Sequence, residues 1–156
     1  MQQNTQYLAK IEGGRAVLKV LGKACYLNCS NAGAFFAKLA EQRIESLEIE
    51  LSECAGMDST FLGMIAGAAL KMREYGGSVS LLNPTPRVAE TAENLGLDKL
   101  VQVRAGPQAA APAEALANAG AATGSILRAH QDLVAADARN AEKFEDVIAF
   151  LKREKS

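Results

Sequence analysis

The segment Asp58-Ser59-Thr60 carries the residues best placed for chemistry. An apolar run follows it, so the Ser59 hydroxyl is expected at the start of a helix, beside free backbone N–H groups and the positive end of the helix dipole. Such donors accept a phosphate as they accept other anions. Phosphorylation of Ser59 would add roughly −1.5 to −2 charge next to Asp58 and change the surface that a partner meets. The alternative is that Asp58 or Ser59 simply caps the helix.

The thiols and the histidine do not form a recognisable set. Cys25 and Cys29 are close enough to supply two metal ligands, but nothing near them completes a zinc site. The only histidine, His130, falls on an apolar helical seam, where packing is its expected role. We therefore expect no metal and no cofactor, three reduced thiols, and a small buried side chain at Cys54.

Motifs and composition restrict the class of protein. The sequence has no phosphate-binding loop, no dinucleotide-binding motif and no Ser-His-Asp set, which argues against an enzyme. A net charge of −1 leaves no basic footprint for nucleic acid. The first ten residues lack a signal-peptide pattern, and no apolar run approaches a membrane span. We expect a cytoplasmic protein that binds partners and has no contact with nucleic acid or membrane.

Local patterns predict an α/β domain over residues 1–104. Apolar alternation on both sides of Gly13-Gly14 indicates a hairpin, and Gly76-Gly77 is placed to end a long apolar helix. Glycines within that helix, such as Gly63, predict close packing against a sheet. The predicted strands are 7–12, 16–21, 46–51, 78–82 and 100–103, the predicted helices are 31–43, 60–75 and 85–95, and residues 52–58 are predicted as a loop. This order favours a mixed four- to five-stranded sheet covered by helices.

Two further segments follow the domain. Residues 105–124 are rich in Ala, Pro and Gly and are predicted to be a linker. Residues 125–156 are predicted to form an extra amphipathic helix, whose apolar seam includes Leu127, Val134, Phe144, Ile148 and Leu151. Two of its four d positions, His130 and Asp137, are polar, so a helix that folds back on its own domain or mediates self-association as a homodimer is favoured over a strong autonomous coiled coil.

Several of these features together resemble the STAS family. They are the strand 47–51, the D-S-T-F-L-G motif at 58–63, the Gly76-Gly77 turn, and the turn and helix of 84–97, which end in Gly96-Leu97. The resemblance covers about residues 7–103. It implies a STAS fold of the anti-sigma factor antagonist type, a phosphoprotein that takes part in signal transduction and transcription regulation.

The resemblance also implies roles for single residues. The phosphorylated residue of the family corresponds to Ser59, and its acidic neighbour corresponds to Asp58. Met57, Thr60 and Phe61 flank this pair and are expected at the switch and partner-binding surface. One departure from the family pattern stands out: the segment 22–31 carries no acidic residue, where related antagonists often have one.

The implied function is partner switching. With Ser59 unphosphorylated, the chain would bind an anti-sigma factor that is a serine kinase; phosphorylation would release it, and a phosphatase would reset it. The alternative is a structural STAS subunit of a signalling assembly or a lipid-transport ABC complex, in which Ser59 would serve only as a helix cap.

Overall fold

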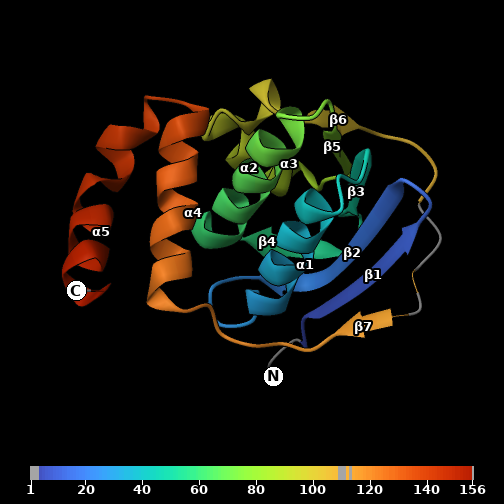
Figure 1. Cartoon of the computed structure of the whole chain (residues 1–156), viewed down its shortest axis with the longest axis horizontal. Coiled ribbons are helices and arrows are strands. Elements are labelled where there is room, and N and C mark those ends of the chain that lie inside the picture. The colour runs from blue at the N-terminus through green and yellow to red at the C-terminus, as the bar shows by residue number, and fades with distance from the viewer. Residues whose placement is uncertain (1–3, 109–111, 113, 156) are drawn as a thin grey trace.

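A computed structural model of the chain describes residues 4–108, 112 and 114–155. Its centre is a mixed sheet, with seven strands within the described residues, in the order β6-β5-β3-β2-β1-β7 and with β4 paired to β2. The expected α/β fold with helices covering a mixed sheet is confirmed (Figure 1). The part of the predicted linker at 109–111 and 113 lies outside the described residues, as do residues 1–3 and 156.

The N-terminal hairpin forms as its sequence predicts. β1 (Gln6–Glu12) and β2 (Arg15–Ala24) pair antiparallel, with Glu12 opposite Arg15 across the turn. Gly13 adopts a φ of 62°, a left-handed conformation that glycine takes without steric cost. The hairpin places one strand, β2, at the middle of the sheet and the other near its edge.

The parallel part of the sheet follows from the alternation of strands and helices. β3 (Ser46–Glu50) pairs with both β2 and β5 (Ser78–Leu82), and β6 (Gln102–Arg104) adds to β5. Leu47, Ile49 and Leu51 are fully buried, as the alternation predicts. A sheet of this kind fixes the ends of its strands, from which the helices and loops of a site begin.

Two strands lie where none was predicted. β4 (Cys54–Met57) occupies the expected loop 52–58 and pairs with the far end of β2, past an irregularity at Gly22 and Lys23. β7 (Glu114–Leu116) lies in the predicted linker and pairs antiparallel with β1. Neither segment shows apolar alternation, because each is short and gains its hydrogen bonds only from a strand that is already in place.

Three helices belong to the STAS-like part of the chain. α1 (Ser30–Glu41) and α2 (Ser59–Arg73) lie side by side on one face of the sheet (Figure 1). α3 (Pro86–Asn94) starts with Pro86 after the capping residue Thr85, and a short 3-10 helix, η1 (Leu97–Lys99), follows it. These positions agree with the predicted helices to within a few residues.

The C-terminal helix is present but divided. α4 (Thr123–Ala136) and α5 (Asn140–Lys155) are separate helices, so the prediction of one continuous helix over 125–156 was wrong in this respect. The chain leaves the helical conformation at Asp137, which is extended (φ −152°, ψ 114°) and hydrogen-bonds the backbone and side chain of Arg139. An Asp that bonds to nearby backbone competes with helix continuation.

The C-terminal helices fold back on the domain, one of the two arrangements expected. α4 packs along the outer side of α2, and α5 packs on α4 (Figure 1). The prediction that Gly63 packs closely against the sheet was wrong, because Gly63 faces Ala129 of α4 instead. No helix among the described residues is long and apolar enough to cross a membrane.

Candidate functional site

Asp58 caps α2 and ties down the loop beside it. Its backbone is extended, and its Oδ1 accepts a hydrogen bond from the Phe61 N–H at 2.9 Å. Its Oδ2 accepts a second hydrogen bond from the Tyr26 N–H at 2.8 Å. The capping role anticipated for Asp58 or Ser59 therefore belongs to Asp58. Because both carboxylate oxygens of Asp58 have partners, it positions the helix start as well as carrying charge there.

Ser59 is the first residue of α2, and its hydroxyl is not used by the cap. The side chain is partly buried, and its Oγ lies 2.9 Å from Nε2 of His130 on α4. The other ring nitrogen of His130, Nδ1, lies 2.7 Å from the Ile126 carbonyl oxygen. A carbonyl oxygen only accepts, so Nδ1 donates to it; Nε2 of the neutral ring then accepts the Ser59 O–H.

The pairing of Ser59 with His130 is a contact that local patterns did not reveal. The two residues are 71 positions apart. Their contact is not a nucleophilic triad, because a backbone carbonyl, rather than a carboxylate, orients the imidazole. The packed role expected for His130 is confirmed: it is 3% exposed, and its ring meets Phe144 of α5 edge-on.

The other predicted switch residues sit deeper than Ser59. Phe61 is fully buried, with its ring 5.8 Å from that of Tyr7 and 6.0 Å from that of Phe36. Thr60 is buried as well, and Met57 is partly buried against the core. Phe61 thus anchors the first turn of α2 in the core. In this conformation Asp58, Ser59 and Met57 retain partial exposure, and a role at a partner surface stays a prediction for all of these residues.

The loop between β2 and α1 forms one side of the site. Asn28 organises it: its side-chain oxygen accepts hydrogen bonds from the Tyr7 hydroxyl (2.6 Å) and the Cys25 N–H (3.1 Å). Tyr26 and Leu27 stand exposed at the tip, beside Asp58. The segment that lacks an acidic residue thus presents an apolar tip next to Ser59. Two consecutive large apolar residues in a polar loop were the signal that could have indicated this surface.

The buried thiols are poorly suited to chemistry. Burial raises the pKa of Cys29 to about 12 and raises that of Cys54 above its usual range. Cys54 is 1% exposed, as expected of a small buried residue, and all three cysteines are free thiols. Across the part of the chain that the structure describes, no cluster of three His, Cys, Asp or Glu side chains could hold a metal ion.

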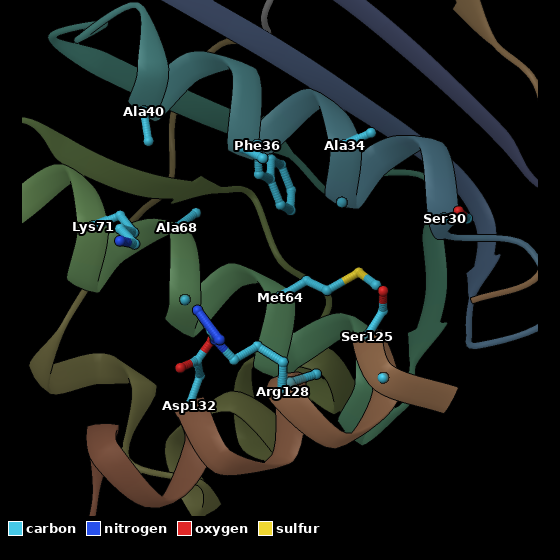
Figure 2. Close-up of a pocket in the computed structure, with 15 residues that line it drawn as sticks. Ser30, Ala34, Phe36, Ala40, Met64, Ala68, Lys71, Ser125, Arg128 and Asp132 are labelled. Carbon is cyan, nitrogen blue, oxygen red and sulfur yellow. The ribbon is translucent and has the colours of Figure 1, made fainter. Parts of the chain in front are cut away.

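A groove of about 470 Å³ runs between α1, α2 and α4 (Figure 2). Phe36 of α1 and Met64 of α2 point into it, and Arg128 and Asp132 of α4 line the opposite wall (Figure 2). Burial raises the pKa of the Asp132 carboxyl above its usual range. The groove lies between α4 and α1, so of the helices α1 and α2 it is α2 on which α4 packs.

The fold and the site define an α/β domain with a serine hydroxyl at the first residue of a capped helix. A family model described as Mlab, STAS domain, matches residues 9–102, which is more than half of the chain. The chain belongs to the STAS domain family, and the resemblance found in its motifs is confirmed. A comparison with curated proteins found no match.

Solved structures share this fold at low sequence identity. The anti-sigma factor antagonist SpoIIAA in its unphosphorylated form aligns with a TM-score of 0.53 and 17% identity, over 65% of this chain and 88% of that one. The phosphorylated form of SpoIIAA, described as a Bacillus cell fate determinant, aligns with a TM-score of 0.56 and 16% identity, over 65% of this chain and 91% of that one. An anti-sigma factor antagonist from Mycobacterium paratuberculosis aligns with a TM-score of 0.53 and 19% identity, over 64% of this chain and 85% of that one.

Proposed function

We propose that this chain is an anti-sigma factor antagonist that works by partner switching. The observation that carries the proposal is the position of the Ser59 hydroxyl at the first residue of α2, where Asp58 has already taken the capping role. Ser59 is therefore not required to cap the helix. Its hydroxyl, which hydrogen-bonds His130, lies beside the positive end of the helix dipole, where a phosphate would be stabilised.

In the proposed cycle, the unphosphorylated chain binds an anti-sigma factor that is a serine kinase, and the kinase releases its sigma factor. The kinase then transfers the γ-phosphoryl group of ATP to Ser59 Oγ; the hydroxyl proton passes to a base of the kinase, and ADP leaves. The chain is the substrate of this reaction and not its enzyme. A phosphatase hydrolyses the phosphoserine and resets the cycle.

Phosphorylation would release the partner through charge. A phosphoserine at position 59 adds roughly −1.5 to −2 charge beside the Asp58 carboxylate. The added group is also bulky and strongly hydrated, so a partner surface fitted to the hydroxyl no longer fits. Asp58 and Met57 would form the contact surface around Ser59, while Thr60 and Phe61 would hold the helix start in place from below. The cycle places the protein in the cytoplasm.

Mass spectrometry of the protein purified from its native host tests the proposal directly. We expect a phosphate on Ser59, lost in Ser59→Ala and retained in the matched control Thr60→Val, because Thr60 is only 3% exposed. Ser59→Ala used as bait should retain a serine kinase that Ser59→Asp does not. An unmodified Ser59, together with equal recovery of the same partner by both baits, would overturn the proposal.

A second candidate function follows from the family description, which names Mlab and not an anti-sigma factor antagonist. In this alternative the chain is a structural STAS subunit of a signalling assembly or a lipid-transport ABC complex. The same bait experiment separates the two functions. Recovery of a transporter ATPase by both Ser59→Ala and Ser59→Asp would favour the structural subunit.

A further inference from the structure

The outer side of α2 is covered by the chain's own C-terminal segment. α4 contributes a buried stripe to this contact, made of Leu127, Ala129, His130 and Leu133. Of these side chains, Leu133 belongs to the main hydrophobic core, whereas Leu127 and Ala129 are buried outside it. The cover therefore joins the domain most firmly near the C-terminal end of α4.

The surface of α2 is shaped for this cover. A Cβ atom placed on Gly63 would clash with the carbonyl oxygen of Ala129, and one placed on Gly67 would clash with the carboxylate of Asp132. These glycines are four residues apart and so share one face of the helix. At Gly63 the backbone of α4 approaches closely because this position lacks a side chain, whereas at Gly67 the neighbour is the side chain of Asp132.

The cover reaches the Ser59 hydroxyl itself. His130 Nε2 holds the hydroxyl at 2.9 Å, and the imidazole is fixed in turn by the Ile126 carbonyl. A kinase must bring its catalytic base and the γ-phosphate of ATP into contact with this oxygen. With α4 in place, the imidazole occupies one side of that space and the hydroxyl is already hydrogen-bonded to it.

The covering helix is held at both of its ends. Its far end is held by Asn140, whose amide donates to the Leu95 carbonyl at 2.8 Å and to the Leu133 carbonyl at 2.7 Å. The segment before α4 is held by Ala121, whose N–H donates to the Tyr26 carbonyl at 2.7 Å. Between these tethers α4 packs on α2 and α5, and the groove of Figure 2 leaves it separated from α1.

We propose that α4 is an intramolecular cover of Ser59 and that the chain exchanges between a closed form, in which His130 holds the Ser59 hydroxyl, and an open form, in which Ser59 and the glycine face of α2 are accessible. The proposal rests on the proposed function of Ser59 as the switch. The closed form slows phosphorylation, because the imidazole stands against the oxygen that the kinase must reach.

Hydrogen exchange of the full-length chain, read by mass spectrometry, tests the cover without any kinase. Ser59→Ala, which removes the hydrogen bond to His130, should raise the exchange of the α4 amides about fivefold. Ser59→Leu, which adds bulk against the imidazole without a charge for the ring to pair with, should raise it about tenfold or more. Ser78→Leu is the matched control, because Ser78 is exposed on β5, and it should leave α4 unchanged.

A second variant opens the cover without touching Ser59 or His130. In Gly63→Ala the added methyl group meets the Ala129 carbonyl and should raise α4 exchange about tenfold, although alanine is the better helix former within α2. The amides of β2 and β3 should keep wild-type exchange in every variant, which shows that the domain stays folded.

Two results would overturn the cover: α4 exchange in Ser59→Leu equal to that of the wild type, or α4 amides that exchange only together with those of β2 and β3. In either case α4 would be a fixed layer of the fold. Failure of the proposed function has a different signature, since an unmodified Ser59 in host cells would leave the exchange results unchanged.

Discussion

Replacement of Asp58 by alanine should destabilise the domain by about 2 kcal/mol. The carboxylate makes two backbone hydrogen bonds, to Phe61 N–H at 2.9 Å and to Tyr26 N–H at 2.8 Å. Loss of an N-cap costs about 1 kcal/mol, and loss of the second hydrogen bond costs about 1 kcal/mol more. The first turn of α2 and the tip of the loop between β2 and α1 both lose their anchor.

Urea denaturation followed by circular dichroism measures this change. With a denaturant slope of about 2 kcal/mol per molar urea, the midpoint should fall by about 1 M. Thermal unfolding should show a decrease in Tm of about 4–8 °C. An unchanged slope would indicate that the native and denatured states keep their difference in exposed surface.

Asp58→Asn is the matched variant, since asparagine is as good an N-cap as aspartate. It should keep the hydrogen bond to Phe61 N–H and lose the acceptor for Tyr26 N–H. Its free energy of unfolding should therefore lie about midway between those of the wild type and Asp58→Ala. A free energy of unfolding for Asp58→Ala within about 0.5 kcal/mol of the wild type would refute the capping argument. Loss of partner binding in Asp58→Asn, with stability largely kept, would show that the negative charge itself is recognised.

Three further predictions concern the C-terminal helices. Hydrogen bonds from Arg139 hold the pKa of Asp137 well below its usual range, so the stabilisation from the Asp137 carboxylate is complete above about pH 5 and is lost as the pH falls toward that depressed pKa. The difference in unfolding free energy between the wild type and Asp137→Asn should therefore shrink between pH 7 and pH 3. A difference that does not change with pH would show that the ionised Asp137 does not stabilise the fold. Asn140→Ala should cost about 2 kcal/mol in urea denaturation, because it leaves the buried Leu95 carbonyl without its amide donor, and an unchanged midpoint would show that water replaces it. If the predicted homodimer forms through the C-terminal helix, the exposed Val147 and Phe150 of α5 are its apolar contact. In sedimentation, the full-length chain should then be a dimer and the Val147→Glu/Phe150→Glu double variant a monomer. Equal molecular masses for the two proteins would exclude this interface.

Much of the domain was predictable because its patterns are local. The hairpin around Gly13-Gly14, the alternating strand of β3, and the Thr85-Pro86 start of α3 each carry their information within a few neighbouring residues. The family resemblance rests on the same local motifs. The predicted domain boundaries at 104 and 124 stay predictions, and the strand β7 within the linker shows that this segment contributes to the sheet.

The elements that were missed depend on partners remote in the chain. β4 and β7 are short segments that become strands by pairing with β2 and β1, and no alternation marks them beforehand. The break at Asp137 interrupts a heptad pattern that continues through it. The glycines of α2 did indicate a close approach, but the identity of the approaching element, α4, required the folded chain.

The segment that carries the proposed chemistry divides in the same way. Local patterns predicted that Ser59 stands at the start of an apolar helix behind an acidic residue, because helix caps and helix starts depend on adjacent residues. The folded chain was needed to show that Asp58 is the cap and that the hydroxyl of Ser59 hydrogen-bonds His130. The physical reason is distance along the chain: a hydrogen bond between residues 71 positions apart is made by the packing of α4 on α2, and no local pattern specifies it.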